Sequence, residues 1–411
     1  MVMDCAIIGG GAVGLAAACH LGRAANHQKS IVVLEKAPRV GKKLLATGNG
    51  MCNLTNIYAN ASNYHGGTAL AERLLNAYTP AQTMAFFTSI GVDCVVREDG
   101  KVYPASEQAA AVLDALRLEL AAYGVETRCD CPVTALRPVG SGFELTTPMG
   151  MTTARQVLVC TGGAAAPSLG GGADGYRLLT DLGCKKTPLF PSIVQLRTAT
   201  DYVRSVKGIR VDAKVTLSLD GKALAAAEGE VLFTDYGVSG PAVMGISRVA
   251  ADWERKKQGI MTVTLDLLPA WESDTLSARI YERSRLVGRT MEDLLTGLLH
   301  KRVGQTILRT CDIALARAAD TLTKAECALA AARIKGWEIA VIGTQGFGGA
   351  QVTAGGIDVT EFTADTLMSR RYRGLYAAGE ILDVDGDCGG YNLQFAWSSA
   401  YATAAAIAAN W

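Results

Sequence analysis

The chain has 411 residues, which exceeds the usual size of one hydrophobic core and predicts two or three domains. Hydrophobic residues make up 49% of the sequence and charged residues 19%, which excludes a largely disordered chain. Lys and Arg (40) balance Asp and Glu (39), so the charge gives no global support for binding to nucleic acid or an anionic membrane.

The cysteine pattern bears on metals and on the cellular compartment. Eleven cysteines are scattered without a CxxC pair or a paired zinc-ligand spacing, so we expect no metal site and a reducing, cytoplasmic setting. No basic region precedes the first apolar run, and we expect no signal peptide. The Ala-rich stretch 396–411 is too short and too polar to span a membrane.

The first fifty residues carry a dinucleotide-binding pattern. An apolar strand is predicted over residues 4–9, a helix rich in Ala and Leu follows up to Gly22, and a second strand is predicted over 30–36. Glu35, at the end of that strand, is placed to accept hydrogen bonds from both hydroxyls of a ribose. An acid at this position disfavours a 2′-phosphate and therefore NADP.

Glycines at G-x-G-x-x-G spacing join the first strand to the helix. Gly9 permits a tight turn, Gly11 lets the backbone approach a pyrophosphate, and Gly14 lets the helix pack closely on the strand. The free N–H groups and positive dipole of the helix N-terminus favour phosphate. This region supplies the following candidate cofactor contacts: Gly9, Gly11, Ala12, Val13, Gly14, Glu35 and Lys36.

The next segment favours FAD over NAD. Residues 41–56 read GKKLLATGNGMCNLTN, rich in Gly and Asn, whereas an NAD dehydrogenase normally continues into ordinary βα units. The segment resembles the signature of the YhiN/BaiN-like family of FAD-dependent flavoproteins, close to K-x-L-x-S/T-G-N-G-R-C-N-x-T-N, although Met51 stands where that family usually has Arg. The resemblance implies that this stretch follows FAD toward the flavin ring. Its candidate contacts are Lys43, Leu44, Gly48, Asn49, Gly50, Cys52 and Asn53.

A second stretch with the same resemblance lies near the C-terminus. Residues 372–400 predict a strand, an acidic turn, a glycine cluster and the start of an Ala-rich helix. They resemble the family's G-L-Y-x-A-G-E-x-L-D-x-x-G-x-x-G-G-Y-N-L-Q-x-A pattern. The resemblance implies contacts to the ribityl chain and pyrophosphate, with the helix N-terminus facing the N1/O2 side of the flavin. The candidates are Gly379, Glu380, Asp383, Gly389, Gly390, Tyr391, Asn392 and Leu393.

Two shorter stretches complete the expected FAD site. Residues 157–163, VLVCTGG, are similar to a cofactor-supporting strand in such flavoproteins and add Thr161, Gly162 and Gly163. Residues 131–136, CPVTAL, resemble the strand that holds the adenine end, where Val133 would lend backbone groups.

The middle of the chain departs from the βα pattern. Alternating apolar residues predict half-buried strands, and residues 274–335 have a helical pattern. We therefore predict an α/β fold: a Rossmann-like FAD-binding domain of the glutathione reductase type, interrupted by an inserted β-rich domain with a helical subdomain. The predicted boundaries are 1–188 plus 345–411 for the FAD domain, 189–273 plus 336–344 for the β-rich domain, and 274–335 for the subdomain.

The chemistry is expected to be that of a flavin. FAD supplies hydride transfer, and the protein supplies position and electrostatics. Tyr391 and Cys52 are the candidate catalytic residues. No second G-x-G-x-x-G lies in a strand–turn–helix setting, so NAD(P)H is expected as a transient reductant. The family resemblance implies an NAD(P)H-linked oxidoreductase acting on an unsaturated or carbonyl-containing small molecule, with a steroid-like substrate suggested.

Two alternatives stay open. One is a flavin oxidase that acts on an amine or a hydroxy acid. The other is a non-catalytic FAD-containing protein that binds RNA or a protein partner, although the balanced charge argues against RNA. We expect a small-molecule substrate, no nucleic acid and no membrane as partners, and the sequence leaves the oligomeric state open.

Overall fold

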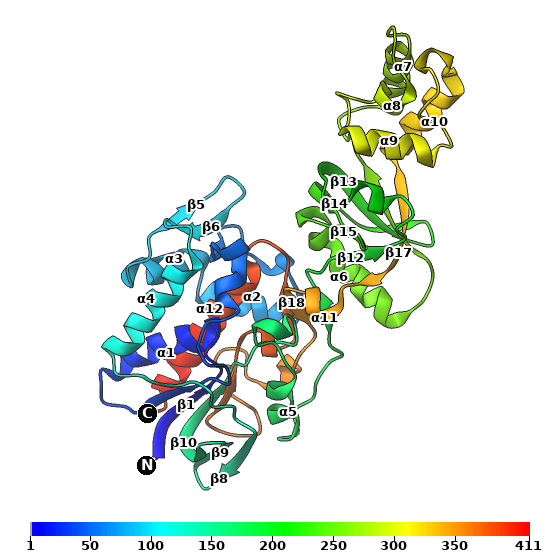
Figure 1. The fold of residues 1–411 in the computed structure, drawn as a ribbon. Helices are drawn as coiled ribbons and strands as arrows, with labels where there is room; N and C mark the ends of the chain where they lie inside the picture. The colour runs from blue at the N-terminus through cyan, green and yellow to red at the C-terminus, as the bar shows by residue number, and fades with distance from the viewer. Residues whose placement is uncertain (1) are drawn as a thin grey trace. The chain divides into compact units, whose positions relative to one another are not determined.

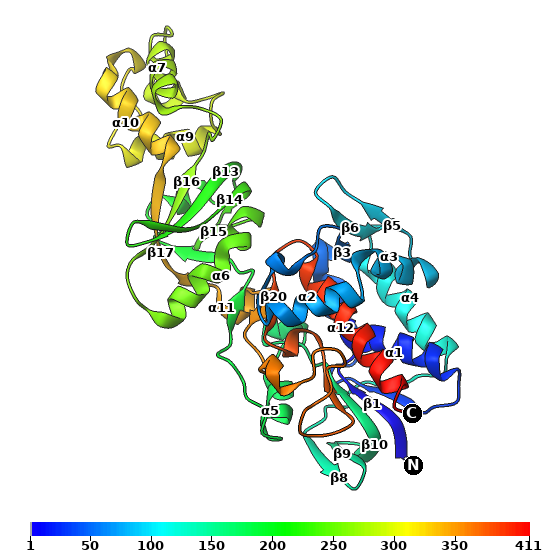
Figure 2. The same ribbon diagram turned by 180° about the vertical axis from the view of Figure 1, so that it is seen from behind.

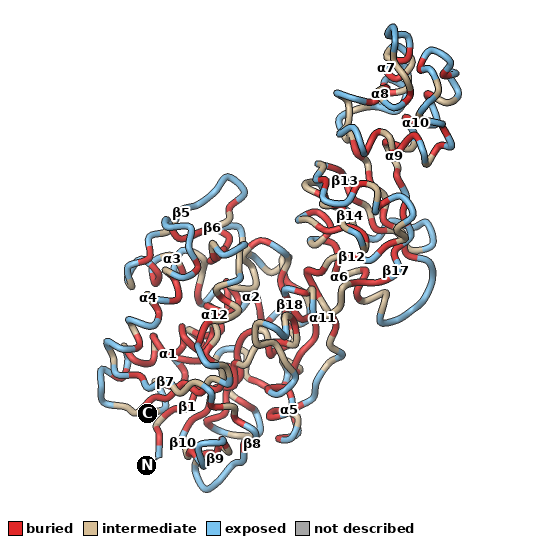
Figure 3. The backbone as a smooth tube through the Cα atoms, in the orientation of Figure 1, coloured by how far each residue is buried: buried red, intermediate tan, exposed pale blue. Residues whose placement is uncertain are grey.

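The computed structural model describes residues 2–411 and divides into two compact units (Figure 1). Unit 1 runs to Pro191 and resumes at Gln351–Trp411, and unit 2 is Ser192–Ala350. Each unit has its own cluster of buried apolar side chains. Figure 3 shows that the buried segments gather along the central strands and helices, while the turns are exposed.

A seven-stranded sheet forms the centre of unit 1. Strands β1, β2, β7, β10 and β19 pair in parallel, and β8 and β9 add an antiparallel edge beside β10. The strands are β1 (Val2–Ile8), β2 (Ile31–Leu34), β7 (Glu126–Arg128), β8 (Ala135–Val139), β9 (Gly142–Thr147), β10 (Gly150–Val159) and β19 (Leu375–Ala377). This Rossmann-like sheet confirms the predicted fold class of the FAD-binding part.

In unit 1, helix α1 (Ala12–Ala25) packs against both α4 (Ala109–Ala122) and α12 (Tyr391–Ala408) (Figures 1 and 2). The first and last helices of the chain are in contact because small Ala side chains on both let the backbones approach. The Trp397 indole N–H donates to the Leu54 carbonyl at 2.8 Å and fixes α12 against the segment that follows the second strand.

Shorter elements surround this core. They are η1 (Leu44–Gly50), β3 (Thr55–Asn56), η2 (Ala61–Asn63), β4 (Tyr64–Gly66), α2 (Thr68–Ala77), α3 (Pro80–Ser89), β5 (Cys94–Val96), β6 (Lys101–Pro104), η3 (Pro167–Leu169), α5 (Asp174–Thr180), β11 (Phe190–Ser192), β18 (Val352–Ala354), η6 (Val359–Glu361), η7 (Gly379–Ile381) and β20 (Val384–Gly386). β4 pairs with β20, and β6 pairs with both β3 and β5.

One predicted strand begins later than expected. Residues 129–134 are irregular, and β8 begins only at Ala135, so Val133 does not lie on a strand. Two residues explain the difference. Asp130 adopts φ +50°, which breaks an extended run, and Pro132 has no N–H to give to a neighbouring strand.

Unit 2 contains a closed six-stranded barrel. Its strands, in order around the barrel, are β12 (Leu196–Thr198), β15 (Gly237–Ser239), β14 (Lys222–Phe233), β13 (Arg210–Leu219), β16 (Met261–Asp266) and β17 (Trp337–Thr344). Helix α6 (Pro241–Lys256) packs on β14, and η4 (Val203–Val206) lies between β12 and β13 in sequence. The barrel confirms an inserted β-rich region, and alternate residues of β16 are buried as the alternation predicts.

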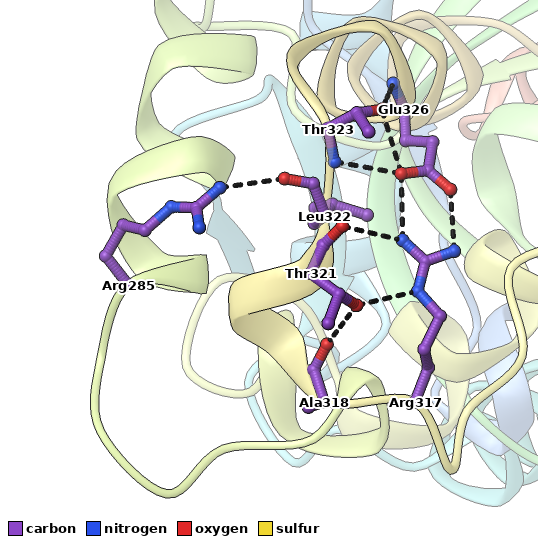
Figure 4. A network of polar contacts seen from close by, with 7 residues as sticks. All are labelled: Arg285, Arg317, Ala318, Thr321, Leu322, Thr323 and Glu326. Carbon is purple, nitrogen blue, oxygen red and sulfur yellow. Dashed lines mark hydrogen bonds and ion pairs between the residues drawn. The ribbon is translucent and has the colours of Figure 1, made fainter.

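A helical part lies within unit 2, between β16 and β17 in the chain. It contains α7 (Ser273–Ser284), α8 (Met291–Leu294), α9 (Lys301–Thr310), η5 (Ala319–Thr321) and α10 (Lys324–Lys335). Thr323 and Glu326 form a capping box at the start of α10. The Arg317 guanidinium donates to both Glu326 carboxylate oxygens at 2.7 and 2.8 Å, and Arg285 donates to the Leu322 carbonyl at 2.8 Å (Figure 4). These bonds tie the loop before α10 to two helices.

In residues 2–411, no helix combines the length and the apolar character that crossing a bilayer requires.

Candidate functional site

The glycine turn between β1 and α1 has a distinct geometry at each glycine. Gly9 adopts φ +112°, and a Cβ there would lie 2.6 Å from the Cys160 carbonyl oxygen. A Cβ on Gly14 would lie 1.9 Å from the Gly9 carbonyl oxygen, so this position packs too closely for any side chain. Gly11 differs, because its Cβ would meet no atom of the described residues within 4 Å. Protein packing therefore explains Gly9 and Gly14, but not Gly11.

Helix α1 starts at this open position. Gly11 is its N-cap, and within residues 2–411 no side chain caps the helix and no acid occupies its first turn. Its first N–H groups thus face the space beside Gly11 with the positive end of the helix dipole. That is the arrangement that binds phosphate in dinucleotide folds.

The Glu35 carboxylate adjoins the same turn. Its Oε2 accepts from the Gly10 N–H at 2.7 Å, and its Oε1 accepts from the Ala37 N–H at 2.8 Å. Each carboxylate oxygen can accept a second hydrogen bond, so ribose hydroxyls can still be bound. The Cys131 N–H donates to the Glu35 carbonyl at 2.8 Å, which brings the segment containing Val133 beside this residue.

Three of the predicted segments meet around Glu380. The Lys43 ammonium lies 2.8 Å from Glu380 Oε2, and the Thr353 N–H donates to Oε1 at 2.9 Å. A Cβ on Gly163 would come within 2.5 Å of Glu380 Oε1. A Cβ on Gly379 would come within 2.4 Å of the Val13 side chain, in the first turn of α1. Residues far apart in sequence therefore surround the N-terminus of α1.

The other end of the predicted site joins residues 48–53 to residues 389–391. A Cβ on Gly390 would lie 2.6 Å from the Thr55 carbonyl oxygen and 2.8 Å from Asn53 Oδ1. The Asn56 side-chain amide donates to the Gly389 carbonyl at 3.3 Å. Four residues of the first stretch have positive φ, at 56°, 55°, 87° and 61° respectively: Gly48, Asn49, Gly50 and Cys52. Non-glycine residues held in this conformation are strained, and such strain gathers at binding sites.

Buried polar atoms without a partner occur at both ends of this arrangement. Among the described residues, neither Asn53 Oδ1 nor Thr161 Oγ1 has a hydrogen-bond partner. Leaving a buried acceptor unpaired costs about 1–3 kcal/mol, so such atoms call for an explanation. A bound group that donates to them would supply one.

The remaining predicted positions have more local roles. The Asn392 side chain accepts from the Gly386 N–H at 2.8 Å and donates to the Gly386 carbonyl at 2.7 Å, so it is occupied within its own turn. The Asp383 carbonyl accepts from the Gly67 N–H at 2.7 Å. Lys36 pairs with Asp174 at 3.3 Å, Leu44 is buried, and Leu393 and Gly162 are half-buried.

Cys52 is a poor candidate nucleophile. Burial raises the pKa of its thiol to about 12, so it is protonated at neutral pH. Tyr391 is half-buried, and its carbonyl accepts from the Tyr64 hydroxyl at 2.8 Å.

No sequence pattern predicts the pair of His65 and Asp387. Their side chains lie 2.9 Å apart, His65 on β4 and Asp387 after β20. No motif contains this histidine, because strand pairing between segments more than 300 residues apart forms the contact.

These features fit FAD, which is the cofactor that the fold implies. The open space at Gly11 and the uncapped start of α1 suit the pyrophosphate, and Glu35 suits the ribose. The unpaired Asn53 Oδ1 and the start of α12, where no side chain of the described residues caps Gly390, suit the polar edge of the flavin. FAD, when bound, supplies hydride transfer.

Comparison with known proteins gives the family. The profile of the HI0933-like protein Rossmann domain matches residues 3–406. The chain belongs to the HI0933-like family. This is a family of FAD-dependent oxidoreductases, so the chain is an oxidoreductase of the flavoprotein class, as the resemblance to YhiN/BaiN-like proteins predicts.

Among the relatives of this HI0933-like protein are two that match over nearly the whole length. It is 37% identical over 406 residues to the 3-dehydro-bile acid delta(4,6)-reductase of Clostridium scindens, covering 98% of each chain. It is 29% identical over 409 residues to the ribosomal RNA dihydrouridine synthase of Haemophilus influenzae, covering 98% of this chain and 97% of that protein.

A solved structure shares the fold. The 3-ketosteroid delta1-dehydrogenase of Sterolibacterium denitrificans superimposes with a TM-score of 0.52 at 12% identity and covers 100% of both chains. At this identity the likeness concerns the fold alone.

Proposed function

We propose that this protein passes hydride from NAD(P)H through FAD to a carbon–carbon double bond or a carbonyl group of a steroid-like small molecule. The observation that carries the proposal is the 37% identity, over 98% of both chains, to a reductase of 3-dehydro-bile acids. The chemistry is consistent with the site, where cofactor-binding groups are many and a thiol nucleophile is disfavoured.

The contacts support a proposed placement of FAD. Glu35 would bind the ribose of the adenosine half, and Gly11 and the start of α1 would hold the pyrophosphate, with Gly379, Glu380 and Gly163 alongside. Residues 48–53 and the start of α12 would hold the flavin ring. The N–H groups at the start of α12 would favour negative charge on that ring.

The test is anaerobic stopped-flow reduction of the FAD-loaded protein by NADH and by NADPH. Reduced protein is then mixed with a 3-keto-4-ene steroid, with the fully saturated 3-ketosteroid as the control. Bleaching of the flavin by a nicotinamide is expected. Recolouring only with the unsaturated steroid identifies the double bond as the acceptor, and recolouring with both steroids identifies the carbonyl group. A flavin that only amines or hydroxy acids reduce, with peroxide formed in air, would instead establish the oxidase. A flavin that neither nicotinamides nor these substrates reduce would favour the non-catalytic alternative.

A second candidate function is reduction of uridine in ribosomal RNA. The full-length similarity to a ribosomal RNA dihydrouridine synthase favours it, and uridine is also reduced at a carbon–carbon double bond. The balanced charge of the chain argues against it, because RNA binding depends on neutralised phosphates. Incubation with NADPH and unmodified ribosomal RNA, followed by dihydrouridine detection, decides between the two. A gel shift of ribosomal RNA by the protein that weakens with salt would support reduction of uridine in RNA.

The cytoplasm remains the proposed location. All eleven cysteines of the sequence lie in the described residues and are free thiols, as a reducing compartment requires. Cell fractionation with an antibody to the protein tests this.

A further inference from the structure

Tyr391 and Lys101 flank one glycine beside the proposed flavin position. Gly389 adopts φ +138°, and a Cβ there would lie 3.1 Å from Tyr391 Cε2 and 3.8 Å from Lys101 Cε. The tyrosine ring and the end of the lysine side chain thus both lie against the space that a side chain at Gly389 would occupy. The Lys101 ammonium is one bond beyond Cε, and its charge acts on the phenol by lowering the pKa of Tyr391.

Tyr391 is held in place on its other side by β4. The Tyr64 hydroxyl donates to the Tyr391 carbonyl at 2.8 Å, and the two rings lie edge to face with centroids 6.4 Å apart. Gly386 lies against the tyrosine as well, since a Cβ there would come 3.0 Å from Tyr391 Cβ. The phenol is therefore fixed in position as well as near a charge.

The ionisable groups around the phenol act on it in opposite directions. Burial raises the pKa of Tyr391, and the carboxylates of Asp387 and Asp99 raise it further, while the Lys101 ammonium lowers it. Asp99 also pairs with Lys101 at 2.5 Å, and Asp387 pairs with His65 at 2.9 Å. The other neighbouring groups are Cys388 and Tyr64.

We propose that Tyr391 is the proton donor of the reduction and that Lys101 is the positioning residue whose charge stabilises its phenolate, with Asp99 opposing Lys101. This inference rests on the proposed function, because it assigns the acid for that reaction. It names a role for the β5–β6 turn, which the sequence did not connect with the site.

Reduction of a carbon–carbon double bond conjugated to a carbonyl adds hydride to the far carbon and a proton to the carbon next to the carbonyl. The hydride originates in NAD(P)H, and the proton leaves the Tyr391 oxygen. Water then returns a proton to the phenolate, whose negative charge Lys101 stabilises in the interval. The net reaction consumes one NAD(P)H and one proton.

The first test removes the acid. Tyr391→Phe keeps the ring against Gly389 and loses only the hydroxyl. We expect transfer to the steroid to slow by roughly 100-fold or more relative to reduction of the flavin by NAD(P)H in the same variant. Steroid reduction within twofold of the wild-type rate would overturn the assignment of Tyr391 without touching the proposed function.

The second test changes the two charges in turn. Lys101→Met should move the alkaline limb of the pH–rate profile to higher pH, because the phenolate loses a stabilising cation. Asp99→Asn should move it to lower pH, because the phenolate loses a repelling anion and Lys101 loses its partner. Lys101→Arg should restore the wild-type profile. Shifts of the same sign for Lys101→Met and Asp99→Asn, as general damage would give, refute the role of Lys101.

A measurement independent of turnover separates this inference from the proposed function. Phenolate absorbance is titrated in the full-length protein, and the Tyr391 contribution is the difference from Tyr391→Phe. The same opposite shifts in Lys101→Met and Asp99→Asn are expected even where no steroid is reduced. Their absence contradicts the electrostatic pairing, whereas their presence with an inactive protein counts against the proposed function alone.

Discussion

Replacement of Gly11 by alanine tests the cofactor position most directly. The Gly11 backbone has φ −84° and ψ −165°, which alanine adopts without strain, and the new methyl group would meet no atom of the described chain within 4 Å. The cost to the protein without FAD is therefore only that of a poorer N-cap, below about 1 kcal/mol. Any larger effect of the methyl group must come from the ligand.

The expected size of that effect follows from binding linkage. Free FAD at about 1,000 times its Kd stabilises the wild-type protein by about 4 kcal/mol. If the methyl group in the pyrophosphate path weakens binding about 100-fold, about 2.7 kcal/mol of this stabilisation is lost. For a unit of this size that corresponds to roughly 5–10 °C in the FAD-dependent part of the melting temperature.

The assay compares thermal melts with and without FAD, together with the flavin content after purification. Gly14→Ala is the comparison variant, because its Cβ would lie 1.9 Å from the Gly9 carbonyl oxygen and should destabilise the protein even without FAD. Gly11→Ala should lose only the increment due to FAD. Wild-type flavin content and an unchanged increment in Gly11→Ala would refute the placement of the pyrophosphate.

Three further predictions concern single side chains. Asn53→Leu should weaken FAD binding about tenfold but leave the melting temperature of the FAD-free protein unchanged or higher, since an unpaired buried acceptor is removed. Equilibrium dialysis measures the binding, and thermal melts measure the stability. A large loss of stability without FAD would contradict this prediction. Glu35→Ala should lower flavin retention and also cost about 1–3 kcal/mol of stability without FAD, because the Gly10 and Ala37 N–H groups lose their acceptor. Glu35→Gln, which keeps one acceptor oxygen, should lose less stability in urea unfolding. Equal losses of stability in the two variants would argue against these hydrogen bonds. Arg317 lowers the pKa of Glu326 to about 2 from the ordinary 4.5, so the stabilisation that the Glu326 carboxylate gives the helical part is complete above pH 4.5 and is lost as the pH falls toward 2 (Figure 4). Glu326→Gln, which keeps the capping box, should cost about 1 kcal/mol at pH 7 and should flatten the acid dependence of stability in calorimetry. An unchanged acid dependence would exclude the ion pair as its source.

Local patterns explain which parts of the fold the sequence predicts. The turn at Gly9, the helix that follows and the strand ending at Glu35 form a contiguous unit, so spacing alone defines them. The pairing of β10 with β19 joins residues more than 200 apart, and no local pattern predicts it. The sequence does not predict closure of the barrel. Alternation in a strand such as β16 indicates which face of the strand is buried, but not which strands pair with it.

The candidate site likewise contains residues that local patterns predict and residues that they do not. The unusual Gly and Asn content of residues 41–56 predicts a special backbone there, and in the structure Asn53 lies beside Gly390. Asn392 was a reasonable candidate by position, yet its amide is used by its own turn at Gly386. Lys101 and His65 carry no local signature, since a hairpin and a distant strand pair bring them to the site.

The points at which the chain leaves and re-enters the flavin-binding unit have a consequence for protein engineering. β11 and β18, on either side of the insertion, pair with each other, and within the insertion Leu196 on β12 pairs with Thr344 on β17. Both ends of the inserted segment are therefore neighbours. Such a module can be excised and its flanks joined by a short linker, or exchanged for the corresponding module of a relative, without rerouting the rest of the polypeptide. All candidate cofactor residues lie outside the inserted segment, so such an exchange leaves the candidate cofactor site intact.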